Sequence, residues 1–257
     1  MLHALEKLFD ADLKALLGDK ASLVLGVALP APTAAKPAVC VSATRLETGG
    51  AGDEAGGARG PAHQLRAQTL TALAGQPTTF KLPAGYSVAD VQAPPGRLLN
   101  AADHYVQQGQ TLQFLTPPPA PVLARLRGDA ARGYTERQSA SIELLVTVWA
   151  ASGAVASALS GEVVGAVLAR FSDTSVIDLV TPGEGPLALR LYRPLAWPAR
   201  VESTLQRLGA SDWPCVTVLL AVRGELELAL GVGAPDPVSR IEHIEYQTQV
   251  QPGFSPG

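Results

Sequence analysis

The sequence predicts an α+β fold: a mixed or antiparallel β-sheet with packed helices, plus an inserted all-β module. Of the 257 residues, 47% are apolar and 17% are charged, which is enough apolar chain to bury a sizeable core. The 21 prolines divide the chain into short segments and favour strands and turns over a helical bundle. Two segments nevertheless have helical spacing, and these account for the packed helices.

The first helix is predicted at the start of the chain and the second near residue 160. In the first, apolar residues recur at steps of three and four, at Leu2, Leu5, Phe9, Leu13 and Leu16. Gly18 is a natural C-terminal stop for this helix. The second spans residues 153–171, with apolar residues at four-residue steps at Val155, Leu159, Val163, Val167 and Phe171.

Alternating or β-branched segments predict the strands. Before the inserted module, strands are predicted at residues 22–29 and 38–46. Within the module they are predicted at 64–73, 78–83, 87–91 and 122–127, together with a hairpin of 104–106 and 110–115. After the module they are predicted at 141–149, 176–180, 187–192, 215–222, 225–230 and 240–250. A tight turn at Arg223-Gly224 is predicted to join two of them. Residues 200–208 fit a helix and a strand equally well.

These segments predict a main domain of residues 1–60 and 141–250, with the β module at 61–140. Residues 47–61 are rich in glycine and predict a flexible surface loop. They do not match a phosphate-binding loop, because no Gly-Lys-Ser/Thr follows and acidic residues lie inside the segment. The last residues, 251–257, predict a loose tail.

Charge and cysteine content narrow the classes of partner. The net charge of −3 and the spread of basic residues do not fit a nucleic-acid binder, and the nearest cluster is Arg127, Arg132 and Arg137. Cys40 and Cys215 lie in apolar stretches and are predicted to be buried thiols in a reducing cytosol. No secretory signal and no membrane partner are predicted. Residues 144–161 lack charge, but Ala, Ser and Gly dominate after Trp149, which favours a strand followed by a helix.

No catalytic motif occurs in the sequence. Asp103-His104 could form an acid–base pair, but a turn aspartate before an exposed strand explains it more simply. The pattern Glu242-His243-x-Glu245 resembles half of a metal site and lacks a third ligand. Asp10 and Asp12 point in different directions on a helix. We therefore predict no catalytic, cofactor-binding or metal residues, and a protein that is not an enzyme.

Two blocks of the sequence carry a family resemblance. The first is Lys81-Leu82-Pro83, then residues 88–91, then Asp103-His104-Tyr105-Val106-x-x-Gly-x-Thr-Leu-x-Phe-Leu, and it resembles small β modules of bacteriophage tail and baseplate-associated proteins. The second is a strand ending in Trp149-Ala150, a helix and paired strands; it is similar to tail-terminator and collar (neck) proteins of phages and contractile injection systems. Residues 61–140 are then an insertion into such a protein.

The resemblance implies a structural protein that forms a homo-oligomeric ring, with a hexamer as the expected form. Such a ring caps or terminates the tail tube, binds tube and sheath proteins, and is built in the bacterial cytoplasm before it joins the particle. An exposed strand edge flanking Val216–Val222 is expected to pair across subunits. The alternative is a carbohydrate- or surface-binding β module, in which Trp149, Trp197 or Trp213 would form a platform.

Overall fold

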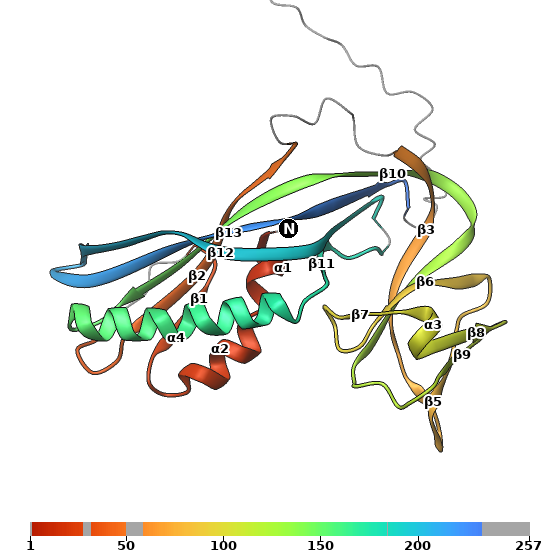
Figure 1. Cartoon of the computed structure of the whole chain (residues 1–257), viewed down its shortest axis with the longest axis horizontal. Helices are drawn as coiled ribbons and strands as arrows, with labels where there is room; N and C mark the ends of the chain where they lie inside the picture. The colour runs from red at the N-terminus through yellow and green to blue at the C-terminus, as the bar shows by residue number, and fades with distance from the viewer. Residues whose placement is uncertain (1, 28–31, 50–58, 184, 233–257) are drawn as a thin grey trace, which may run out of the picture.

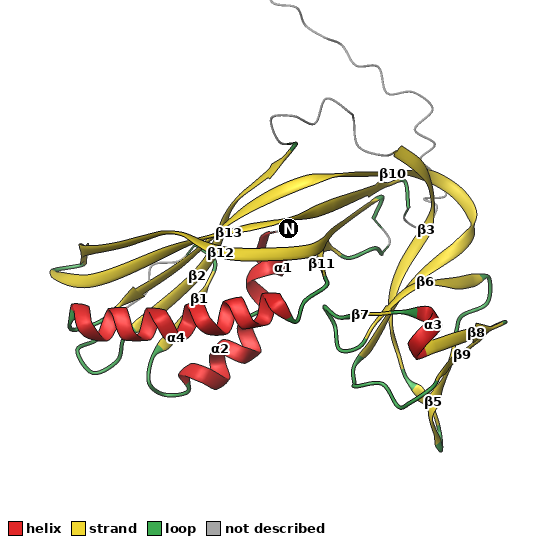
Figure 2. Ribbon diagram, in the orientation of Figure 1, coloured by secondary structure: helices red, strands yellow, loops and turns green. Residues whose placement is uncertain are grey.

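The computed structural model describes residues 2–27, 32–49, 59–183 and 185–232. In the described part of the chain the protein is mostly β, with 59% of those residues in strands and 18% in helices, around one large and almost wholly antiparallel sheet (Figures 1 and 2). The predicted α+β class is therefore wrong. The reason is strand length, because segments expected to be turns or loops continue as strand.

The large sheet has nine strands, and its main path runs in the order β1-β2-β10-β13-β12-β11. β1 and β2 are parallel, and the other neighbours on this path are antiparallel. The strands of this path are β1 (Ser22–Leu25), β2 (Ala38–Thr48), β10 (Val122–Trp149), β11 (Val176–Val180), β12 (Leu187–Leu208) and β13 (Ser211–Leu230).

β10 is the longest strand, at 28 residues, and it belongs to two parts of the protein. Its second half pairs with β2 and β13, whereas its first half pairs with β3 (Arg59–Leu70) and β6 (Tyr86–Gln92). The strand bends strongly between these halves (Figure 1). The prediction of separate strands at residues 122–127 and 141–149 is wrong, because both belong to β10.

β12 and β13 form a long hairpin whose turn lies at Gly209, where φ is +64°. Residues 200–208, ambiguous in sequence, are strand. The predicted turn at Arg223-Gly224 is wrong, because β13 continues through it. Gly224 is needed there for a different reason: a Cβ atom on it would lie 2.7 Å from the Tyr192 carbonyl oxygen. The glycine permits close approach of two strands.

Helices cover one face of the large sheet. They are α1 (Leu2–Lys7), α2 (Asp10–Leu17) and α4 (Gly153–Ser172), and they share one apolar core with residues 39–46, 140–150 and 216–228 (Figure 2). The predicted first helix is thus split in two, and Gly18 ends α2 as predicted, with its N–H donating to the Lys14 carbonyl. α4 agrees with the prediction to within one residue; it begins after Ser152, whose hydroxyl accepts a hydrogen bond from the Val155 N–H.

α4 is also the one described helix that is long and apolar enough to cross a membrane, by length and composition alone. Val163, Val167 and Phe171 are buried against the sheet. This face accounts for the apolar character of the helix.

A second core lies in the region of residues 70–126. It is formed around a four-stranded sheet, with the hairpin of β8 (Tyr105–Gln108) and β9 (Thr111–Phe114) confirmed as predicted. The other elements here are β4 (Ala72–Leu73), β5 (Gln76–Lys81), β7 (Leu98–Leu99) and α3 (Ala101–His104). Phe114 packs edge-on against Phe80, and these rings lie at the centre of this core.

Two predicted elements fall largely or wholly on residues outside the described ranges. They are the strand at 240–250 and most of the glycine-rich segment 47–61. The two ends of that segment are strand, because residues 47–48 belong to β2 and residues 59–61 belong to β3. The predicted tail at 251–257 also lies outside the described residues. The predicted domain boundary at residues 140–141 falls within β10.

Candidate assembly surface

The described residues that come closest to a catalytic constellation each contact other groups in the structure. His104 lies in the exposed helix α3 and its Nδ1 is 3.1 Å from the Asn100 carbonyl oxygen, while Asp103 accepts a hydrogen bond from the Asn100 side chain. Asp10 pairs with Lys14, and Asp12 with Arg170. Glu242, His243 and Glu245 lie outside the described residues. Within the described ranges, no group of three or more His, Cys, Asp or Glu side chains could hold a metal ion.

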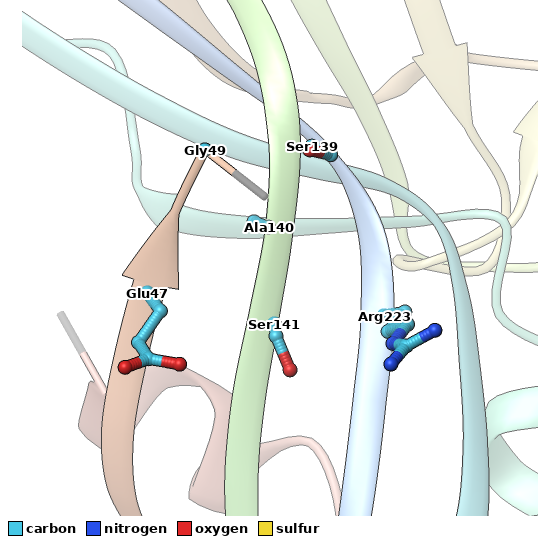
Figure 3. A pocket seen from close by; sticks show the side chains of 6 residues that line it. All are labelled: Glu47, Gly49, Ser139, Ala140, Ser141 and Arg223. Carbon is cyan, nitrogen blue, oxygen red and sulfur yellow. The ribbon is translucent and has the colours of Figure 1, made fainter. Parts of the chain in front are cut away.

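A polar hollow of about 400 Å³ lies on the sheet face opposite the helices. Glu47, Ser141 and Arg223 form a row across β2, β10 and β13, with Gly49, Ser139 and Ala140 beside them (Figure 3). Its two charges are engaged elsewhere, since Glu47 pairs with Arg45 and the Arg223 guanidinium lies 5.2 Å from the centre of the Trp197 ring. The lining contains no histidine, cysteine or aspartate to activate a hydroxyl.

A buried ionic cluster holds the bend of β10 in place. Arg125 from the first half of β10 donates to Glu227 Oε1 at 2.8 Å, and Arg137 from the second half donates to Glu227 Oε2 at 2.8 Å and 3.0 Å. Only 6% of the Arg125 side chain and 8% of the Glu227 side chain are exposed. One carboxylate of β13 therefore joins both halves of the bent strand.

A second set of charges lies beside the first. The Arg190 guanidinium of β12 pairs with Asp178 of β11 and with Asp90 of β6. The Tyr192 ring lies between the two sets, with the guanidinium carbons of Arg137 and Arg190 at 4.9 Å and 5.7 Å from its centre. Asp90 lies on β6, which pairs with the first half of β10, and Asp178 lies on β11 at the end of the main strand path, so this cluster joins two distant parts of the large sheet.

The two carboxyl groups respond in opposite directions to this setting. Burial raises the pKa of Glu227, but the Arg125 and Arg137 guanidinium groups outweigh it and hold that pKa below its ordinary value. For Asp90, burial outweighs the attraction of Arg190 and Arg125, and the pKa is raised. Oδ1 of Asp90 is buried without a hydrogen-bond partner, which fits the raised pKa.

The free edge of β12 is the most prominent apolar feature of the surface. Within the described part of the chain, β11 pairs with β12 only as far as Tyr192, so residues 195–208 have β13 on one side and no strand on the other. Leu195 is 69% exposed, Val201 64% and Leu205 73%. An unpaired strand edge with exposed apolar side chains is a template for pairing with another chain.

β1 forms the opposite end of the same sheet. Among the described residues it pairs only with β2, so its outer edge is also open. Val27, two residues beyond β1, is 91% exposed. The two edges differ in length and sequence. We refer to both of them together as the assembly surface, which consists of β1 with Val27 at one end of the sheet and residues 195–208 of β12 at the other.

The cysteines and tryptophans contribute to packing. Cys40 and Cys215 are both buried, as predicted, and neither forms a disulfide. Trp149 is buried beside them, with its ring nitrogen donating to Gln206 Oε1 at 2.9 Å, and Trp213 packs on the same cluster. Trp197 is the exposed tryptophan, at 37%. The three rings therefore form no common platform.

The ionic cluster was not predicted from the sequence. Its members were hidden as single charges inside apolar strands, as in Val176-Ile177-Asp178-Leu179-Val180 and Glu225-Leu226-Glu227-Leu228. Alternation places such a charge on the face opposite the apolar core, where a basic residue on the neighbouring strand can supply its partner, as Arg190 does for Asp178 and Arg137 for Glu227. This is the signal that would have found Asp178 and Glu227.

No protein-family model matches the chain, and no curated protein is significantly similar to it.

Proposed function

We propose that this chain is a non-enzymatic assembly protein that binds copies of itself in a closed ring. The observation that carries the proposal is that one sheet ends in two open and unlike edges, β1 and residues 195–208 of β12. Contacts between unlike surfaces build rings when the rotation between neighbours closes. Each subunit then uses one edge for each neighbour.

The strand directions support this mode of association. β12 runs parallel to β10, since both are antiparallel to β13, whereas β1 runs antiparallel to β10, since it is parallel to β2. The two edges therefore run in opposite directions. A second copy placed in the same orientation would extend the sheet with an antiparallel pair, the more stable ladder.

We further propose that the ring caps or terminates the tail tube of a phage-like particle, as a hexamer assembled in the bacterial cytoplasm. The support is the sequence resemblance to tail-terminator and collar proteins. In this role the work is binding, with one face of the ring fitted to tube or sheath and the other unable to continue the polymer. Asp103, His104, Asp10 and Asp12 each contact a group other than a catalytic partner, namely Asn100, Lys14 or Arg170, which favours a protein without catalysis.

Light scattering across a concentration series tests the first step. The proposal requires a discrete closed oligomer whose mass does not grow once it has formed, and electron microscopy of that species counts the subunits. Co-sedimentation with assembled tail tubes tests the second step. A strict monomer at all concentrations that also fails to bind tubes contradicts the proposal.

A further inference from the structure

We infer that the edge of β12 pairs with β1 of the next copy, and that Val27 of that copy enters the apolar hollow between α4 and β12. The inference rests on the ring proposed above and specifies its contact.

Val27 lies directly beyond the hydrogen bonding between β1 and β2. The Gly26 N–H donates to the Val41 carbonyl at 2.9 Å, so hydrogen bonding to β2 continues one residue past the strand. Gly26 has a φ of +92°, which turns the chain there. Val27 follows this turn and is the most exposed large apolar side chain of the described residues, at 91%.

The hollow lies where the edge of β12 becomes free. Its volume is about 470 Å³, which accommodates a valine side chain together with the backbone that carries it. Leu168 and Phe171 of α4 form one wall, and Pro194, Leu195 and Ala196 of β12 form the other. Arg193, with a φ of +48°, turns β12 away from β11 at this point.

Strand direction brings Val27 and this hollow together. Because the two edges are antiparallel in an extended sheet, the end of β1 meets the start of the free edge of β12. Ala196 faces the helices, because it pairs in register with Val222 of the core beneath them. Placing Val27 opposite Ala196 brings Leu23 opposite Val201 once the bulge of β12 between Pro198 and Arg200 is included. The short β1 strand then covers the first part of the free edge.

The remaining apolar side chains of the edge are explained in the same way. Val201 pairs in register with Val218, which packs in the core beneath the helices, so Val201 points to the helix face. Leu205 lies four residues further on the same face. In an extended sheet, α2 of the next copy directly precedes its β1 and lies on this same face, over Val201 and Leu205.

Disulfide trapping tests the contact directly. The variant Val27→Cys/Ala196→Cys, oxidised under mild conditions, is expected to give a ladder of covalent species ending at the mass of the closed oligomer. Val27→Cys alone and Ala196→Cys alone should give no ladder, because each cysteine then faces a residue that cannot bridge. The native thiols of Cys40 and Cys215 are buried and serve as an internal background.

A charge on the projecting side chain gives an independent measurement. Val27→Asp is expected to weaken association about 10- to 100-fold, the effect of losing one buried valine side chain at the contact. Val106→Asp is the matched control, because Val106 is a 47% exposed valine in the β8–β9 hairpin. It should leave association unchanged.

The outcomes separate this inference from the proposed function. A ladder in the double variant together with the loss in Val27→Asp supports the inference. If the closed oligomer forms but Leu205→Cys alone gives covalent dimers, β12 pairs with β12 of a second copy, and the inference is wrong although self-association is real. If Val27→Asp and Val106→Asp behave alike in a normal oligomer, Val27 lies outside the contact. A monomer that shows no ladder overturns both.

Discussion

Arg125 and Arg137 lie on opposite halves of one strand, yet they bind the two oxygens of the same carboxylate, that of Glu227. A straight strand would hold these side chains far apart, so the shared partner defines the bend of β10. Buried ion pairs contribute little net stability on average, but breaking one leaves an uncompensated charge. The contact therefore matters most for the geometry of the bend.

Removing the carboxylate should destabilise the protein strongly. Glu227→Ala leaves the buried Arg125 unpaired, and we expect a loss of about 3–5 kcal/mol in the free energy of unfolding, measured in urea. Glu225→Ala is the matched control on the same strand, since Glu225 is 45% exposed and lies 3.9 Å from Arg137; its loss should stay below about 1 kcal/mol. The double variant Arg125→Met/Glu227→Leu should lose less than Glu227→Ala. Equal losses in Glu227→Ala and Glu225→Ala would show that the cluster does not hold the bend.

Stability should depend on pH through Glu227 and Asp90 with opposite signs. The pKa of Glu227 is lower in the folded protein than its ordinary value of 4.5, so its contribution is present above pH 4.5 and is lost as the pH falls through the folded value. The pKa of Asp90 is raised above 3.8, so its contribution is present below pH 3.8 and is lost as the pH rises through the folded value. Urea unfolding between pH 3 and 7 should show the stability of wild type falling relative to Asp90→Asn as the pH rises. As the pH rises, the stability of wild type should increase relative to that of Glu227→Gln. Plots of stability against pH that run parallel for wild type and both variants would contradict both pKa directions.

Two glycines should respond to alanine in opposite directions. Gly224→Ala places a Cβ 2.7 Å from the Tyr192 carbonyl oxygen and 2.8 Å from Leu191 Cδ1, and we expect a loss of about 1–3 kcal/mol in unfolding free energy. Gly161→Ala adds a methyl to an exposed position of α4 with nothing within 4 Å, and should gain about 1 kcal/mol from helix propensity. Thermal unfolding of both variants checks this. A stable Gly224→Ala would mean that β12 and β13 are further apart than described.

Charges on the free edge should block association without unfolding the subunit. Val201→Glu/Leu205→Glu introduces two carboxylates at side chains that are 64% and 73% exposed. Because exposed substitutions change stability by about 0.5 kcal/mol or less, the unfolding curve should stay the same. Sedimentation velocity should show the oligomer replaced by monomer. An unchanged oligomer would place the contact elsewhere on the molecule.

The sequence predicted local elements well where periodicity was strong. The helix α4 and the strand β11 agree closely with their predictions, because each has a complete apolar pattern between clear boundary residues. Strand lengths were not predictable in the same way. Gly128 and Gly133 in β10, and Pro194 and Pro198 in β12, suggest turns locally, yet pairing with neighbouring strands keeps the chain extended.

The candidate site depended on information that periodicity does not contain. Whether Leu205 is exposed follows from which strand lies beside β12, and that is decided by residues far away in the sequence. Residues 216–222 of β13 are paired on both sides, with β10 and with β12, so the open edge lies one strand further out, on β12; its use between subunits stays a prediction. The ionic cluster joins residues from five strands, and no local pattern specifies such a meeting.

The length of β10 also has a mechanical meaning. The same strand is hydrogen-bonded to β2 and β13 at one end and to β3 and β6 at the other. The two cores are therefore joined by a paired strand as well as by single-chain connections. Force applied to the β8–β9 hairpin would travel along β10 into the centre of the large sheet, between β2 and β13. There it would load many ladder hydrogen bonds together in shear. The region of residues 70–126 would thus transmit an applied force directly to the large sheet.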